Sequence, residues 1–206
     1  MAAERTEAMT TPAVRVSFPN VFKKRSYQGG TPAFGIRLMF DKTNKEQMGF
    51  LKKLKTDMEA AQARQWPDAA NRPRIPMVGH DKSPIKDGDK NCNGQGIPFL
   101  EKSPELAGHF FMSCSSYNDV LPVVDRNREE IIDAQAVYGG CWCKVNLNAY
   151  ARTRADNPGM SFGLNGVQKV RDDERIGGGG APSVDSMFEA AGGSNDSSNY
   201  DSDIPF

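Results

Sequence analysis

The stretch that decides the fold runs from residue 140 to residue 154 and reads GCWCKVNLNAYARTR. Small, apolar residues alternate in it with larger polar and aromatic ones, which is the period of a strand with one buried face. One face carries Cys141, Cys143, Val145, Leu147 and Ala149, and we expect it to lie in the core. At ~3.3 Å per residue the outward face from Trp142 to Arg154 would extend over roughly 40 Å. This is the most informative strand of the chain.

The opposite face of this stretch predicts contact with single-stranded nucleic acid. Trp142 and Tyr150 offer rings on which bases could stack, and stacking contributes ~1–3 kcal/mol per base. Lys144, Arg152 and Arg154 offer positive charge for phosphates. The alternative is an ordinary solvated sheet face, with Trp142 covered by a loop.

Outward from this stretch, the same alternation predicts further strands. They lie at residues 14–18, 34–40, 109–115 and 160–170, with a short one at 120–124. Val14, Val16 and Phe18 would share the buried face of the first strand, and Pro19 would end it. The chain is therefore expected to be mainly β.

One long helix is expected between the early and the late strands. Thr43 and Glu46 have the spacing of a helix capping box. Apolar residues then recur at three- and four-residue steps, namely Met48, Leu51, Leu54, Met58 and Ala61. The helix would end near Trp66. Residues 67–108 contain six prolines and indicate a long loop region.

Two further groups could extend the nucleic-acid path. The first strand, the turn after it and the second strand contribute Lys23, Lys24, Arg25, Tyr27 and Arg37. The alternative for this set is an ordinary charged surface. Phe111 is a further stacking candidate, although one member of a Phe-Phe pair is more often part of the core.

The charge of the chain is divided unevenly. All 26 basic residues but only 21 of the 26 acidic residues precede position 176, so this part carries a net charge of +5. A basic body with an acidic tail is typical of a nucleic-acid binder with an interaction segment. No apolar run reaches the ~18 residues of a membrane helix, and the N-terminus lacks the apolar core of a signal peptide. We therefore expect a cytoplasmic protein with reduced cysteines.

The sequence predicts no metal, no cofactor and no enzymatic activity. Cys141 and Cys143 are spaced too tightly for a structural zinc pair, and a second pair is missing. Residues 87–91 begin like a calcium loop, but Cys92 stands where its glycine belongs and Pro98 where its closing glutamate belongs. A magnesium-dependent nuclease is the catalytic alternative.

The chain closes on an acidic and aromatic hexapeptide, DSDIPF at 201–206. It resembles the C-terminal tip of bacterial single-stranded DNA-binding proteins, with Ser202 where another aspartate is usual. The resemblance implies a docking peptide for a replication or repair enzyme, formed by Asp201, Asp203, Ile204, Pro205 and Phe206. The Gly, Ser and Asn-rich residues 177–200 predict a flexible linker before it.

Several segments resemble the replicative single-stranded DNA-binding proteins of tailed bacteriophages. They are PIKDGD at 84–89, PVVD at 122–125, YGGCWC at 138–143 and GMSFGLNGVQ at 159–168. The family ordinarily has a glycine near Asp173, so this chain departs from it in one turn. The resemblance implies an OB-fold β-barrel that coats single-stranded DNA during phage replication and recombination.

These observations predict four segments and a set of partners. The segments are a flexible N-terminus over 1–11, an OB-fold DNA-binding domain over 12–176, the linker over 177–200, and the docking tip over 201–206, the last two forming a disordered acidic tail. The expected partners are single-stranded DNA and a polymerase, helicase or nuclease. Duplex DNA and a homo-oligomer or filament stay open. So do two rival functions, a strand-annealing recombination mediator and a decoy for host replication enzymes.

Overall fold

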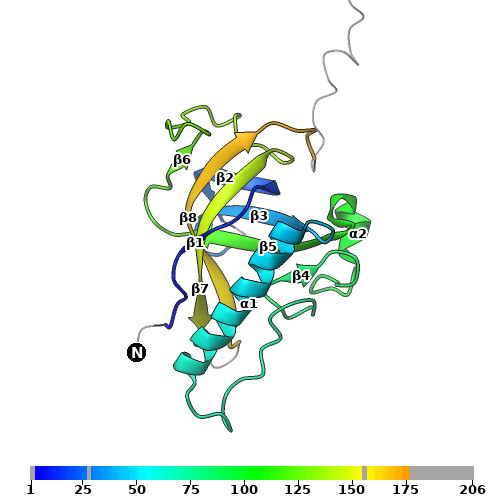
Figure 1. The fold of residues 1–206 in the computed structure, drawn as a ribbon, viewed down its shortest axis with the longest axis vertical. Coiled ribbons are helices and arrows are strands. Elements are labelled where there is room, and N and C mark those ends of the chain that lie inside the picture. The colour runs from blue at the N-terminus through cyan, green and yellow to red at the C-terminus, as the bar shows by residue number, and fades with distance from the viewer. Residues whose placement is uncertain (1–2, 27–28, 155–156, 177–206) are drawn as a thin grey trace, which may run out of the picture.

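A sheet of eight strands dominates the computed structural model, which describes residues 3–26, 29–154 and 157–176 (Figure 1). The strands are β1 Met9–Thr10, β2 Val14–Arg25, β3 Ala33–Asp41, β4 Lys86–Asp87, β5 His109–Ser116, β6 Val123–Val124, β7 Trp142–Arg152 and β8 Gly159–Arg171. The four longer predicted strands are thus present as β2, β3, β5 and β8. Within the described ranges no helix is long and apolar enough to cross a membrane.

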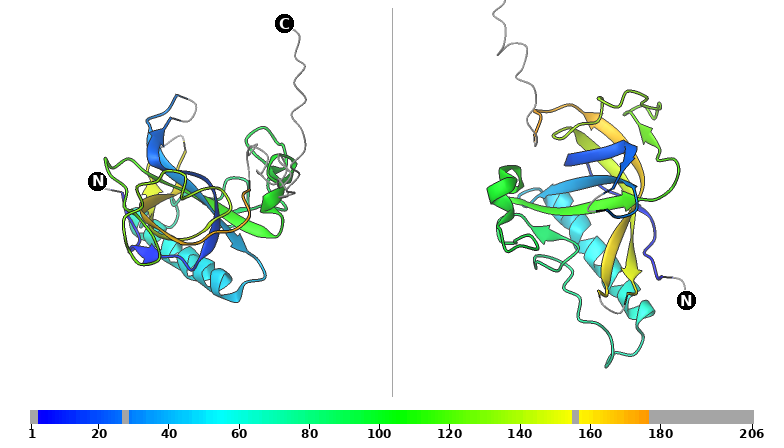
Figure 2. Two further views of the ribbon diagram at one scale, coloured as in Figure 1. Left: turned by 90° about the horizontal axis from the view of Figure 1, so that it is seen from above. Right: turned by 180° about the vertical axis from the view of Figure 1, so that it is seen from behind.

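The long strands pair in a circuit that returns to its starting strand. β7 pairs with β2, β2 with β3, β3 with β5, β5 with β8, and β8 again with β7. All of these pairings are antiparallel except the one between β5 and β8. Seen from above, the strands curve around a common interior (Figure 2).

The alternation of β7 is confirmed. Its five small and apolar predicted core residues are 0% exposed and point to the interior. Cys141 and Cys143 are free thiols within this core, in agreement with the prediction that they act as small apolar residues. The opposite side chains, from Trp142 to Arg152, face outward.

Helix α1, Lys45–Gln65, occupies the stretch for which the sequence predicts a helix. Its N-cap is Asn44, whose side chain accepts hydrogen bonds from the backbone N–H groups of Glu46 and Gln47. The expected cap Thr43 instead donates its hydroxyl hydrogen to Asp41, because the chain still turns out of β3 at that point. The buried face of α1, including Leu54 and Met58, packs against the sheet beside β3 and β7 (Figure 1).

Strand β2 differs from its prediction at Phe18 and Pro19. The strand continues through Pro19 to Arg25, because a register irregularity between Ser17 and Asn20 absorbs the missing N–H of the proline. Phe18 takes a φ of 49° in the left-handed region. Its side chain is therefore 52% exposed on the outer surface instead of buried beside Val16.

The N-terminal segment also differs from its prediction. Residues 1–11 were expected to be flexible, but most of the part that is described pairs along β7. β1 lies antiparallel to β7, and the backbone N–H of Thr6 donates to the carbonyl of Ala149. Thr6 and Thr11 are buried and accept hydrogen bonds from β7 amides through their hydroxyls. The sequence does not indicate this pairing, because the segment binds the edge of β7 through polar residues such as Thr6 and Thr11.

The proline-rich region 67–108 is mostly loop, as predicted. It contains β4, a short helix α2 at Phe99–Lys102, and a single 3-10 turn η1 at Pro104–Leu106. Lys42 anchors the region, because its Nζ lies 2.6 Å from carboxylate oxygens of both Asp87 and Asp89. This anchoring positions the segment 82–86 beside the outer face of β5.

Candidate nucleic-acid interface

A cleft of about 440 Å³ lies on the outer face of the sheet over β5, β8 and β7. We call it the aromatic cleft. Small side chains form its floor, among them Ser113 and Ser115 of β5 and Ser161 of β8. Short side chains leave the backbone of these strands open to a ligand, while larger residues line the sides.

Two tyrosines line the aromatic cleft. Tyr150, a predicted site residue, lies on β7 and is half-buried. Tyr117 follows the end of β5 and is 59% exposed. Sequence reasoning missed Tyr117, although its place directly after a predicted strand was a usable signal. Both rings are available for stacking against a flat ligand.

Positive charge surrounds these rings. Lys82, Lys86 and Arg152 line the aromatic cleft, and no aspartate or glutamate is among its described lining residues. Burial lowers the pKa of Lys86, an effect that the nearby Asp81 partly offsets. Lys86 also donates to the backbone carbonyl of Asp81 and its Nζ lies 5.7 Å from the centroid of the Phe99 ring. An anion in the cleft would therefore meet cations, and no carboxylate stands among the described lining residues to compete with it.

A row of aromatic and basic side chains leads away from the aromatic cleft across β3. The Arg37 guanidinium lies 4.8 Å from the ring centroid of Phe18 and 5.2 Å from that of Phe111. Phe111 lines the cleft but is only 3% exposed, with Phe99 packed edge-on at 4.9 Å. Phe18 is thus the open ring of this row, and Phe111 supports Arg37 from beneath.

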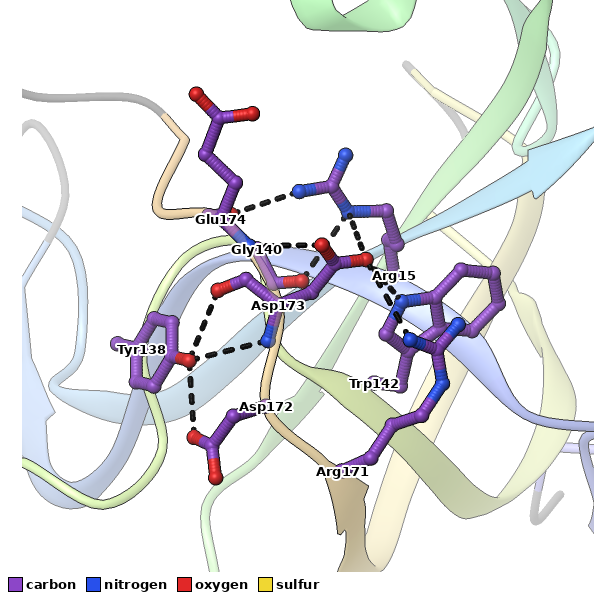
Figure 3. A network of polar contacts seen from close by, with 8 residues as sticks. All are labelled: Arg15, Tyr138, Gly140, Trp142, Arg171, Asp172, Asp173 and Glu174. Atoms are coloured by element: carbon purple, nitrogen blue, oxygen red, sulfur yellow. Dashed lines mark hydrogen bonds and ion pairs between the residues drawn. The ribbon is translucent and has the colours of Figure 1, made fainter.

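Trp142 occupies a different environment at the opposite end of β7 (Figure 3). Its Nε1–H donates to Asp173 Oδ2 over 2.6 Å, and the Arg171 guanidinium lies 4.2 Å from the indole centroid. Arg15 completes the contact, with Nε 3.7 Å from the same carboxylate. The hydrogen bond from Trp142, with smaller contributions from the Glu174 amide and both arginines, lowers the pKa of Asp173.

Tyr138 holds the same chain segment from its other side (Figure 3). Its hydroxyl oxygen lies 2.9 Å from both Asp172 Oδ1 and the carbonyl oxygen of Asp173, which share its single hydrogen. We call residues 171–176 the closing segment, since they lie over Trp142 and Tyr138 at the end of β8.

The other predicted site residues lie at several places on the surface. Lys144 is exposed on β7, and Arg154 is exposed just beyond the end of that strand. Lys23 and Arg25 are exposed on β2, whereas Lys24 donates to the carbonyl of Tyr117 and pairs with Asp119. Tyr27 and the docking tip 201–206 lie outside the described residues. Within the described residues, no group of three or more His, Cys, Asp or Glu side chains could hold a metal ion.

The sequence of the chain matches a known protein family. Residues 6–198 match the family described by the ssDNA-binding protein of Enterobacter phage Enc34. Because this match spans most of the sequence, the chain belongs to that family. Among curated proteins, none matches the chain.

Solved structures of phage proteins share the fold. The single-stranded DNA-binding protein of bacteriophage Enc34 in complex with ssDNA is 23% identical, with a TM-score of 0.66 over 82% of this chain and 89% of that one. A second structure, described as the single-stranded DNA-binding protein from bacteriophage Enc34, gives a TM-score of 0.64 at 22% identity, over 88% of this chain and 90% of that one. The single-stranded DNA-binding protein gp2.5 of bacteriophage T7 gives 0.57 at 14% identity, over 93% and 100%.

Proposed function

We propose that this protein binds single-stranded DNA without sequence preference and coats it during phage DNA replication and recombination. The aromatic cleft is the observation that carries the proposal. It combines the rings of Tyr117 and Tyr150 with three cations and no described carboxylate. Stacking and phosphate neutralisation are the two interactions that sequence-tolerant binding requires. Membership in the Enc34 family supports the same function.

The finer assignments rest on this proposal. We assign the circuit of β2, β3, β5, β7 and β8 to an OB-fold barrel, because the outer face of such a barrel commonly binds single strands. Tyr150 and Arg152 would contact DNA directly, and Arg37 with Phe18 would extend the path. The segment 201–206 would recruit a replication enzyme through its carboxylates and Phe206. The protein would act by binding and not by catalysis.

A salt titration tests the proposal. The affinity for oligo-dT should fall steeply as salt rises, with a slope of about −0.7 per neutralised phosphate in a log–log plot. A duplex of the same length serves as the control and should bind more weakly. An affinity for oligo-dT that does not change with salt, or equal binding of both forms, would contradict the proposal.

Two rival functions are separated by further assays. A strand-annealing mediator would accelerate the pairing of complementary strands at saturating protein, whereas a coating protein would not. A decoy for host enzymes would depend on its tip alone. Under the proposed function, Phe206→Ala should abolish capture of replication enzymes while leaving oligo-dT affinity unchanged. A parent protein that captures these enzymes but does not bind DNA would favour the decoy.

A further inference from the structure

A second cleft, of about 480 Å³, opens beside the aromatic cleft. We call it the basic cleft. Arg74, Ile75 and Pro76 line it from the loop after α1, and Arg152, Asn157 and Pro158 line it from the end of β7 and the turn before β8. Lys82 completes the lining. None of the side chains in the set is an aromatic ring.

The two clefts are contiguous. Lys82 and Arg152 line both clefts. A linear polymer that leaves one cleft along these side chains would therefore enter the other. The basic cleft has three cations, Arg74, Lys82 and Arg152, and no carboxylate among its described lining residues. Within the described part of the chain, none of the three forms an ion pair with an aspartate or glutamate.

The guanidinium of Arg152 is held in place but poorly supplied with acceptors. It lies against the backbone of Gly159, where a Cβ would come within 2.3 Å of Nη2. That nitrogen reaches Asn157 Oδ1 only at 3.5 Å, and the buried Nε has no hydrogen-bond partner among the described residues. A planar guanidinium matches the geometry of the oxygens of a phosphate.

We infer that the basic cleft binds the phosphodiester backbone of the same DNA strand as it leaves the aromatic cleft. The inference rests on the proposed function and extends its site. Because the basic cleft has cations but no ring, it holds phosphates and leaves stacking to Tyr117 and Tyr150. Arg152 stands at the junction, and Arg74 marks the far end of the path.

Arg74→Glu tests the inference, since Arg74 is exposed and lines the basic cleft but not the aromatic cleft. Binding is measured by anisotropy with a series of dT oligonucleotides from about 4 to about 16 nucleotides, the range of site sizes for OB folds. Lys52→Glu, on the exposed face of α1, is the control with the same change of charge. Arg74→Gln is the milder variant, and circular dichroism checks that each variant is folded.

The expected result is a length-dependent defect. The parent and Arg74→Glu should bind the shortest oligonucleotides equally, and Arg74→Glu should lose about three- to tenfold in affinity once the strand reaches the basic cleft. Lys52→Glu should lose less at every length. If Arg74→Glu behaves like Lys52→Glu at all lengths, or weakens all lengths equally, the inference is wrong while the aromatic cleft still stands. A parent that binds no length would overturn the proposed function as well.

Discussion

The two ends of the outer face of β7 differ in how their side chains are satisfied. At one end, Trp142 donates to Asp173 and lies beneath Arg171, so the closing segment supplies its partners. At the other end, Tyr150 and Arg152 face a cleft that has lysines but no described carboxylate. Both ends belong to the same alternating stretch of sequence, residues 140–154. Under the proposed function, the segment packed against each end of the strand decides whether an outward aromatic supports the fold or contacts DNA.

The largest expected effect separates these two ends directly. Tyr150→Ala should weaken oligo-dT binding by about 1–3 kcal/mol, or roughly 5- to 150-fold, because a stacking ring is lost. Trp142→Ala should change the affinity by only about 0.5 kcal/mol, since the indole is already engaged by the protein. Anisotropy titrations of both variants at one salt concentration measure the difference.

Thermal unfolding provides the control for this pair. Trp142→Ala should lower the melting temperature more than Tyr150→Ala does, because it removes a half-buried ring and leaves Asp173 without its indole donor. If Trp142→Ala weakened DNA binding as much as Tyr150→Ala, the Trp142 end would belong to the binding face, and the contrast between the two ends would be lost.

The fold was predictable where side chains alternate with a strict period. The core face of β7 follows directly from Cys141 to Ala149, because a single slip in register would expose every one of them. On β2, Phe18 does not follow this alternation, because its side chain points outward. A positive φ at a non-glycine residue reverses the direction of the side chain, and residue types alone do not report it.

The candidate site was predictable only in part. Tyr150 and Arg152 follow from the outward face of one strand. Lys82, Arg74 and Tyr117 join them from loops that lie far away in the sequence. The position of the loop that carries Arg74 and Lys82 depends on tertiary contacts, such as the pairing of Lys42 with Asp87 and Asp89. Such contacts leave no periodic pattern in the sequence.

Phe18 sharpens the comparison, because it is an outward aromatic whose backbone is strained. A non-glycine residue in the left-handed region costs about 1–3 kcal/mol, and glycine escapes most of this cost. We therefore expect Phe18→Gly to be more stable than Phe18→Ala by about 1 kcal/mol, while both weaken oligo-dT binding to the same extent. Denaturant unfolding and anisotropy measure the two properties.

Each result for Phe18 has a clear reading. Equal stability of the glycine and alanine variants would mean that the backbone is unstrained at this position. Unchanged affinity in both variants would remove Phe18 and its contact with Arg37 from the DNA path, and binding would then be confined to the two clefts.

The smallest expected effect concerns acid and the Trp142 end. Hydrogen bonding from Trp142 lowers the pKa of Asp173 below its ordinary value of 3.8. The stabilisation from this carboxylate is therefore present above that value and is lost as the pH falls through the lower pKa of the folded state. In a Trp66→Phe background, the fluorescence of Trp142 should change in that acidic range. Asp173→Asn should remove the change, because its side chain does not titrate.

Far-UV circular dichroism in the same titration distinguishes local from global change. A shift of Trp142 fluorescence that precedes any loss of strand signal would place the event at the closing segment. If the shift coincides with unfolding in the parent and persists with Asp173→Asn, another carboxylate controls it. The Trp142 end would then be held by ring packing against Arg171 and not by the charge of Asp173.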